Sequence, residues 1–243
     1  LPGTLHIVKT VTNNNGGTAV ANDFSFSVND DDLVAFEEDG QNDITVSAGT
    51  YTVEEALDSR YTTTYSQGGE SSDCNDIVIA NGGEATCTIT NDDKPAHLTI
   101  VKHTDEQSGN GTFGFTVTGT GTTTLETVEG TATSLPLELN AGSYDVAEVV
   151  PDGWALSSVS CLRGEVDTGE SITNGKSITL SNNDSVVCTF TDTKRATLTV
   201  KKVVINDNGG TKTASDFSFK INNGENTSFV AGENNLLGEN NVV

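Results

Sequence analysis

The sequence predicts an all-β protein made of tandem β-sandwich domains, and three observations indicate this fold class. A stretch at 4–29 returns at 197–222, with 15 of 26 positions identical at a constant offset of 193 residues. Thr, Asn, Gly, Ser and Val dominate a chain that has no Met, a composition that favours strands and turns over helices. Short runs of alternating apolar residues are separated by turn signals about every 8 to 12 residues, as in β-sandwiches.

The self-similarity divides the chain into three repeats that each begin with a lysine-bearing strand. We expect repeat 1 at 1–95, repeat 2 at 96–195 and an incomplete repeat 3 at 196–243. A period near a hundred residues suits a small domain better than a solenoid unit. The first strands alternate two apolar residues with a lysine on the same face, and these are Leu5, Ile7 and Lys9, then Leu98, Ile100 and Lys102, then Leu198, Val200 and Lys202.

Repeats 1 and 2 then follow the same order of elements. In repeat 1 a turn at 13–17 precedes a strand with Phe24 and Phe26, another strand at Ile44, a Gly-Thr-Tyr strand and a closing strand. Repeat 2 presents Phe113, Phe115 and Val117, then Leu135, Leu137 and Leu139, then a Gly-Ser-Tyr strand, a core Trp154 and a closing strand. The two-residue period of a strand places six polar residues on core-facing positions, namely Lys9, Glu55 and Asn91 in repeat 1 and Lys102, Glu148 and Asp192 in repeat 2.

Repeat 3 contains only the first part of this order. After its first strand come a turn at 206–210 and a strand with Phe217, Phe219 and Ile221, but no Gly-x-Tyr strand and no closing strand. Half of a sandwich would leave an apolar face and open strand edges in water. We therefore expect the missing strands either to lie outside this segment or to come from another copy of the chain by strand addition.

The charge and hydropathy of the chain exclude several classes of partner. A net charge of −23 argues against nucleic acid and against anionic membrane surfaces. No apolar run approaches the ~20 residues of a membrane helix, and the chain opens at Leu1 without Met or a signal peptide, which predicts a removed leader or a mature segment. The acidic run Asp30, Asp31 and Asp32 is a candidate calcium ligand set, although the spacing of an EF-hand is absent and a solvated loop is the alternative.

The four cysteines fall two and two within repeats 1 and 2. Cys74 with Cys87 and Cys161 with Cys188 each bracket a hairpin that leads into a closing strand, so we predict these two disulfides and an oxidising, extracytoplasmic compartment. Free buried thiols or metal ligands are the alternatives, and the absence of Cys-x-x-Cys disfavours zinc. Glycosylation sequons occur at Asn110, Asn183 and Asn226, at a frequency near chance for so Asn- and Thr-rich a chain.

The order of a lysine-bearing strand, Gly-x-Tyr-x-x-x-Glu and a closing strand ending in Asn or Asp resembles Cna-B/SpaA-type domains. These are transthyretin-like, or prealbumin-like, Ig-like modules of bacterial surface adhesins and pilins, and the closing runs at 87–92 and 188–192 resemble their disulfide-bearing group. In that family a buried Lys can condense with an Asn or Asp, assisted by a Glu. The resemblance thus implies candidate isopeptide sites made of Lys9, Glu55 and Asn91 and of Lys102, Glu148 and Asp192. Lysines with solvated heads, or ordinary ion pairs, are the alternatives.

These observations together favour a structural role. We expect a subunit of an extracellular filament, pilus or cell-surface stalk that self-associates into a homopolymer, with repeat 3 completed by a neighbour. The alternative is an adhesin whose loops bind a host protein or glycan, with the repeats as a spacer. The sequence has no nucleophile elbow, phosphate loop or metal-binding helix, so we expect no enzyme of external substrates and no required cofactor, with calcium optional.

Overall fold

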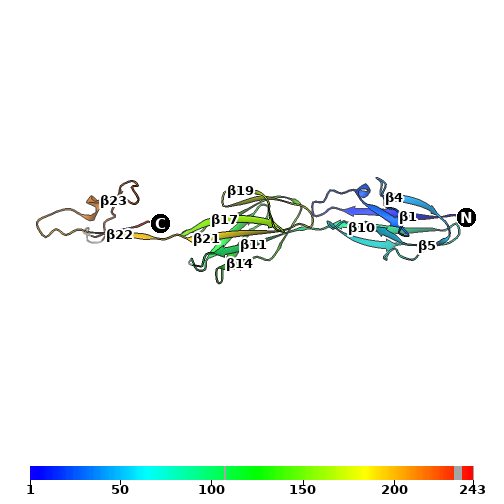
Figure 1. Ribbon diagram of the computed structural model, residues 1–243, viewed down its shortest axis with the longest axis horizontal. Helices are drawn as coiled ribbons and strands as arrows, with labels where there is room; N and C mark the ends of the chain where they lie inside the picture. Colours follow the sequence, from blue (N-terminus) through cyan, green and yellow to red (C-terminus); the bar gives the residue numbers. More distant parts are fainter. Residues whose placement is uncertain (107, 233–236, 243) are drawn as a thin grey trace.

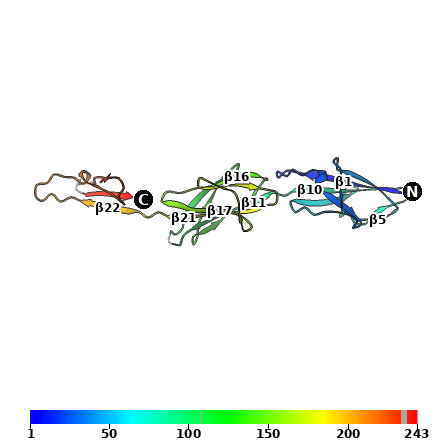
Figure 2. The ribbon, with the colours of Figure 1, turned by 45° about the horizontal axis from the view of Figure 1, so that its top comes forward.

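The computed structural model describes residues 1–106, 108–232 and 237–242. The chain is elongated, and the three repeats follow one another along its longest axis (Figures 1 and 2). In the described residues, regular structure is almost entirely strand, with two 3-10 helices of three residues each, which confirms the all-β fold class. Among the described residues no helix is long and apolar enough to cross a membrane.

Repeat 1 folds around one five-stranded sheet with the order β4-β1-β10-β7-β8, faced by two smaller sheets, β3-β2-β6 and β5-β9. Its first and closing strands, β1 and β10, lie side by side and run parallel. The elements of repeat 1 are β1 (Gly3–Thr12), η1 (Ala21–Asp23), β2 (Ser25–Val28), β3 (Val34–Ala35), β4 (Gln41–Val46), β5 (Gly49–Tyr51), β6 (Val53–Glu55), β7 (Tyr61–Gln67), β8 (Glu70–Ser71), β9 (Ile77–Ile79) and β10 (Glu84–Asp93).

Repeat 2 has the same arrangement with a fuller second sheet. A six-stranded sheet follows the order β14-β11-β21-β17-β18, with β15 also paired to β11, and faces a five-stranded sheet of order β13-β12-β16-β20-β19. The first strand β11 again runs parallel to the closing strand β21. The strands are β11 (Ala96–Thr104), β12 (Thr112–Val117), β13 (Thr122–Glu126), β14 (Thr131–Thr133), β15 (Leu137–Leu139), β16 (Gly142–Val149), β17 (Trp154–Arg163), β18 (Val166–Asp167), β19 (Glu170–Ile172), β20 (Gly175–Leu180) and β21 (Ser185–Lys194).

The alternating strands of repeats 1 and 2 bury one face each. Leu5 and Ile7 of β1 and Leu98 and Ile100 of β11 are fully buried, as their two-residue period predicts. Trp154 is also buried, and its ring lies 5.0 Å from that of Phe113, in an edge-to-face contact. One prediction is wrong in detail, because the expected run of three leucines begins only at Leu137. Leu135 precedes Pro136, lies outside β15 and is 86% exposed.

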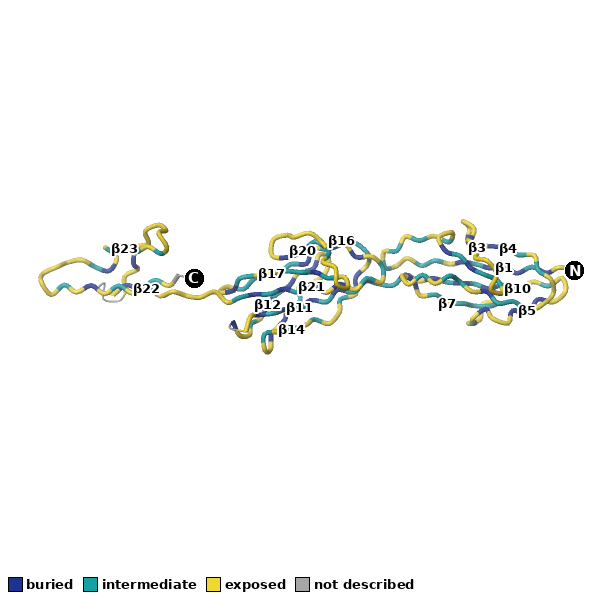
Figure 3. Tube along the Cα trace, in the orientation of Figure 1, coloured by how far each residue is buried: buried dark blue, intermediate teal, exposed yellow. Residues whose placement is uncertain are grey.

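Repeat 3 contains a smaller set of strands and a smaller core. β22 (Leu198–Val203) pairs antiparallel with β25 (Leu237–Val242), and β23 (Ser218–Phe219) pairs with β24 (Thr227–Ser228), after the 3-10 helix η2 (Ala214–Asp216). These elements repeat the order β1, η1, β2, β3 and β4 of repeat 1. β25 was not predicted from the sequence, because its residues lack apolar alternation. The core consists of Val204, Ala214 and Phe229, and most of the trace of repeat 3 is exposed (Figure 3).

Candidate functional site

The first candidate site lies between the two layers of repeat 1, where three strands place Lys9, Glu55 and Asn91. Lys9 is on β1 and Asn91 on the neighbouring β10, which pairs with β1 so that Asn91 lies opposite Val11. Glu55 ends β6, in the facing sheet, and pairs with Phe26. All three residues therefore lie at core-facing positions of their strands, as predicted, and the packing of the two sheets brings them together.

Glu55 stands between the other two residues of this site. One of its carboxylate oxygens, Oε1, contacts Lys9 Nζ and accepts a hydrogen bond from Asn91 Nδ2 at 3.3 Å, while Oε2 accepts one from Thr63 Oγ1 at 3.1 Å. The side chains of Lys9 and Glu55 are 0% and 1% exposed. Asn91 is fully buried, and its carbonyl oxygen has no hydrogen-bond partner among the described residues. The alternative of a lysine head in solvent is thus wrong for Lys9.

Burial sets the proton affinity of this lysine. Removal of the ammonium from water lowers the pKa of Lys9, and the hydrogen bond and charge of Glu55 oppose that shift without cancelling it. The net direction is downward, so a neutral amine is more accessible here than on a surface lysine. A neutral amine is the form of lysine that can act as a nucleophile.

The second site, in repeat 2, has the same layout but carries an acid in place of the amide. Lys102 of β11 contacts Glu148 of β16, with Nζ 3.1 Å from Oε1 and 3.2 Å from Oε2. Its Nζ also lies 2.6 Å from Oδ1 of Asp192 on β21, as an ion pair without hydrogen-bond geometry. All three side chains are 0% exposed. The alternative of a solvated lysine head is therefore wrong for Lys102 as well.

Two carboxyl groups around one cation leave this buried site with an excess negative charge when both are ionised. Burial raises the pKa of Glu148 to about 7; the charge and hydrogen bond of Lys102 oppose the rise, and Asp192 adds to it. Near neutral pH, a proton on Glu148 gives the site a balance of one cation and one anion. Glu148 can then donate a hydrogen bond or a proton, which an ionised carboxylate cannot do.

An aromatic ring lies under the lysine in all three repeats, and sequence reasoning missed this role. Lys9 Nζ is 4.4 Å from the centre of the Phe24 ring, and Lys102 Nζ is 4.3 Å from that of Phe113. In repeat 3 the distance from Lys202 to Phe217 is 4.1 Å. The signal was present as the Phe-x-Phe strand after each lysine strand. The ring face attracts the ammonium while excluding water from it.

Repeat 3 has the lysine and the ring without the acidic partners. Lys202 is half-buried, and no described carboxylate forms an ion pair with it. The adjacent Lys201 instead points to solvent and pairs with Glu239 at 3.3 Å. The edge of β22 that faces away from β25 has no hydrogen-bonded strand in the described part of the chain. Repeat 3 thus presents half of the site that repeats 1 and 2 contain in full.

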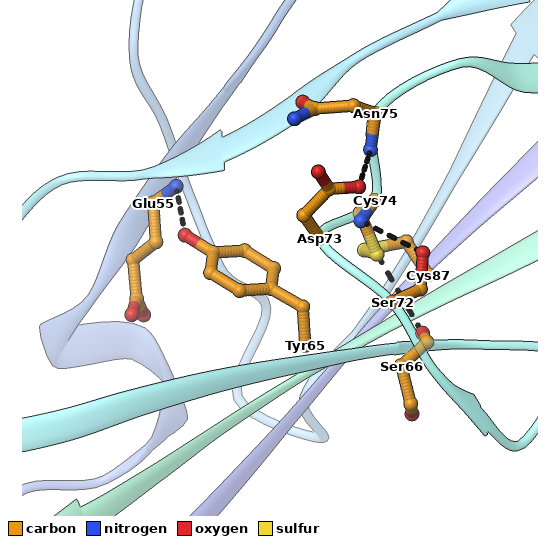
Figure 4. Close-up of a disulfide and its surroundings, with 8 residues drawn as sticks. All are labelled: Glu55, Tyr65, Ser66, Ser72, Asp73, Cys74, Asn75 and Cys87. Carbon is orange, nitrogen blue, oxygen red and sulfur yellow. Dashed lines mark hydrogen bonds between the residues drawn. A yellow bond between two sulfur atoms is a disulfide. The ribbon is translucent and has the colours of Figure 1, made fainter.

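Both predicted disulfides are present, and each attaches to a closing strand. Cys74, in the loop before β9, bonds to Cys87 of β10, while Cys161 of β17 bonds to Cys188 directly opposite on β21. Figure 4 shows the first bridge beside the segment at 72–75 and Tyr65, whose hydroxyl accepts a hydrogen bond from Glu55 N at 3.1 Å. The first disulfide therefore attaches the loop before β9 to the closing strand β10.

The other predicted sites show no comparable organisation. Asp30, Asp31 and Asp32 are exposed, and among the described residues no group of three or more His, Cys, Asp or Glu is placed to hold a metal ion. Of the sequons, Asn226 is exposed, Asn110 accepts a hydrogen bond from Gly130 N at 3.0 Å, and Asn183 donates one to Ser59 O at 3.0 Å. Calcium binding and glycosylation stay predictions.

Comparison with protein families gives two matches that together cover nearly all of the chain. Both family models are described as a prealbumin-like fold domain of the SpaA type. One matches residues 98–194, and the other matches residues 1–89 and again 193–242. The second model thus matches most of repeat 1 and nearly all of repeat 3. A search of curated protein sequences finds no match.

Solved structures with a similar fold have low sequence identity to the chain. The Bacillus anthracis TIE protein is 16% identical with a TM-score of 0.51, and the match covers 99% of this chain but 43% of that one. The chain therefore spans less than half the length of that protein. The major pilin T-13 of Streptococcus pyogenes (15% identity, TM-score 0.32) and a C-terminal fragment of the pilus adhesin SpaC of Lactobacillus rhamnosus GG (16%, 0.33) each match over 79% of this chain and 97% of their own.

Proposed function

Because the chain belongs to the family of prealbumin-like fold domains, we propose that it is a structural segment of an extracellular filament, pilus or cell-surface stalk. The observation that carries the proposal is the pair of buried lysine sites, each of which connects the first and the closing strand of a repeat. The elongated arrangement, the two disulfides and the strongly acidic composition also suit a protein exposed at a cell surface.

The strand order explains why such sites matter for a load-bearing chain. Tension enters a repeat through its first strand and leaves through its closing strand, and these two strands are adjacent and parallel in repeats 1 and 2. A bond between Lys9 and Asn91 joins the two strands directly. The chain between them is then relieved of load, and the repeat cannot extend.

We propose that Lys9 and Asn91 form an isopeptide bond with Glu55 as the proton carrier. The Lys9 Nζ lone pair attacks Asn91 Cγ, the Nζ–Cγ bond forms, the Cγ–Nδ2 bond breaks and ammonia leaves. Glu55, in contact with both nitrogens, takes a proton from Nζ and delivers it to the departing Nδ2. The lowered pKa of Lys9 supports the nucleophilic step.

In repeat 2 the same step joins Lys102 to Asp192 and releases water. The Lys102 ammonium first gives up one proton, its Nζ lone pair then attacks Asp192 Cγ, and the Nζ–Cγ bond forms as Nζ loses a second proton. One Cγ–Oδ bond breaks, and that oxygen leaves as water with these two protons. Glu148 is suited to protonate the leaving oxygen, because its pKa is raised to about 7 by burial. The ion pair of 2.6 Å between Lys102 and Asp192 already holds the two reacting groups together.

Intact mass spectrometry tests both bonds. Purified protein should lack the mass of one ammonia and one water beyond the four hydrogens of its disulfides, and digestion should yield two branched peptides. Glu55→Gln should restore only the ammonia and Glu148→Gln only the water. Glu54→Gln, on the exposed face of the same strand, serves as the control and should change neither. An undiminished mass of the unmodified chain would contradict the isopeptide proposal.

For repeat 3 we propose completion by strand addition from a neighbouring copy, which would join copies into a homopolymer. Support comes from the unpaired edge of β22, the half-buried Lys202 and a hollow of about 340 Å³ lined by residues of β22 and β25 and by Gly232. An added strand would run beside β22 and present an Asn or Asp to Lys202, as β10 and β21 do in repeats 1 and 2.

Negative-stain microscopy tests this assembly. Filaments with a regular axial repeat would support it, and Lys202→Ala should shorten them, whereas Lys201→Ala, at the neighbouring exposed lysine, should leave them intact. Dispersed rods would contradict the homopolymer. They would favour the other role, a spacer that carries an adhesin which binds a host protein or glycan.

A further inference from the structure

The joint between repeats 1 and 2 is built from polar groups that the lysine sites do not use. The turn at 13–17 of repeat 1 meets two loops of repeat 2. Asn15 O accepts a hydrogen bond from Ala141 N at 2.8 Å and another from Asn182 Nδ2 at 3.1 Å. A Cβ on Gly16 would lie 2.8 Å from Ala141 O, so the two backbones are in close contact. The turn of repeat 1 thus docks directly onto repeat 2.

Asp93, at the end of β10, connects this turn to repeat 2. Its carboxylate accepts hydrogen bonds from the backbone N–H groups of Asn14 at 2.9 Å, Asn15 at 2.9 Å and Gly17 at 2.6 Å. It accepts a further one from Asn182 Nδ2 at 3.1 Å. Asp93 is only 2% exposed. Burial raises the pKa of its carboxyl, but these N–H donors outweigh burial and the net pKa is lowered.

The short connection between the two repeats is also held on both sides. Only Lys94 and Pro95 separate β10 from β11. Lys94 O lies 3.1 Å from Asn182 Nδ2 and 3.3 Å from Asn183 N, both of which donate to it. Asn183 Nδ2 donates to Ser59 O of repeat 1 at 3.0 Å. The connection therefore has little freedom to rotate.

The joint between repeats 2 and 3 has none of these features. Lys194 follows Asp192 by two residues, as Asp93 follows Asn91 in repeat 1, so a lysine takes the place of the clamp carboxylate. The Lys194 ammonium lies 5.8 Å from the ring of Trp154, within repeat 2. The residues at 195–197 are all exposed, and Arg195 N donates to Gly153 O of repeat 2 at 2.8 Å, so the connection proper is 196–197. Hydrogen bonds and ion pairs among the described residues stay within repeat 2 or within repeat 3 at this joint.

We infer that repeats 1 and 2 form one rigid body held by a clamp of Asn15, Asp93 and Asn182, and that the chain bends at 196–197. Relative motion of neighbouring domains is the default where few contacts cross the boundary. The clamp removes that freedom at the first joint by placing one side-chain amide against three acceptors of the preceding repeat. A stalk made from such units has stiff two-repeat segments separated by hinges.

Residual dipolar couplings of the whole chain in a dilute aligning medium test the inference. Couplings from repeats 1 and 2 should fit one alignment tensor, and those from repeat 3 should give a degree of order about twofold lower. Asn182→Ala should give repeats 1 and 2 different alignment tensors. The amide chemical shifts of residues away from the joint should stay unchanged, which shows that both repeats remain folded. Asn22→Ala, at an exposed residue of η1, serves as the control and should keep a shared tensor.

Asp93→Asn provides a second variant, because its amide nitrogen would face N–H donors and weaken the same clamp from repeat 1. It should also separate the tensors. Separate tensors for repeats 1 and 2 in the unmodified chain would overturn the inference. So would a shared tensor in both clamp variants, or a repeat 3 that is ordered together with repeat 2.

Discussion

The lysine sites of repeats 1 and 2 differ in one functional group, and that group changes the charge of a buried cluster. In repeat 1 the lysine and one carboxylate balance each other beside the neutral amide of Asn91. In repeat 2 the acid Asp192 takes the place of the amide, so one proton must be retained to reach the same balance. Identical layouts therefore impose different proton requirements as long as the lysine is not yet joined to Asn91 or Asp192. Comparisons of the two repeats in that unjoined state probe the difference.

Removal of the cation should affect repeat 2 more than repeat 1. Lys102→Met leaves Glu148 and Asp192 buried without a counter-charge and should destabilise repeat 2 by ~3–5 kcal/mol. Lys9→Met leaves only Glu55 without a counter-charge, and Glu55 keeps its hydrogen bond from Thr63. The loss of stability in repeat 1 should therefore lie at the lower end of that range. Urea unfolding can be followed for repeat 2 by the fluorescence of Trp154, the only Trp of the chain, and for repeat 1 by hydrogen exchange.

The double variant Lys102→Met/Asp192→Asn is the matched control for this prediction. It removes one of the two carboxyl groups that have lost their counter-charge, so it should recover part of the lost stability. Equal losses in the two single variants, or no recovery in the double variant, would show that the added acid of repeat 2 does not govern the site.

The disulfides provide a comparison of a different kind, because they close loops of different length. Cys161 and Cys188 are 27 residues apart, whereas Cys74 and Cys87 are 13 apart. By loop entropy, replacement of both cysteines by serine should cost about 3.5 kcal/mol in repeat 2 and about 3 kcal/mol in repeat 1. Thermal unfolding with and without reductant measures both. A larger loss in repeat 1 would show that loop length does not set the order of the two effects.

The pH dependence of stability should have opposite signs in the two repeats. Glu148 has a pKa of about 7 in the folded chain, above its ordinary 4.5. Its contribution to the free energy of unfolding is therefore full below pH 4.5 and is lost as the pH rises through about 7. The total loss is about 3 kcal/mol. The pKa of Lys9 is lowered from 10.5, so its contribution increases as pH rises toward 10.5. Urea midpoints of each repeat at several pH values test this, and parallel profiles would contradict it.

Much of the site could be predicted from sequence because strand alternation is a strict two-residue pattern. It placed Lys9, Glu55 and Asn91 at core-facing positions of their strands, and the constant order of elements placed the second set likewise. What alternation cannot show is the packing between layers. It therefore missed the ring beneath each lysine and the clamp at Asp93, whose partners come from loops distant in sequence.

The smallest expected effect concerns those rings. Phe113→Leu removes the aromatic face under Lys102 and leaves an apolar side chain of similar reach, so repeat 2 should lose ~1–2 kcal/mol. Phe217→Leu should cost repeat 3 less, about 0.5–1 kcal/mol, since Lys202 is half-buried and still partly hydrated. Trp154 fluorescence follows the first change, and hydrogen exchange in β22 follows the second. A larger loss in repeat 3 would mean that its lysine depends on the ring in place of the missing acids.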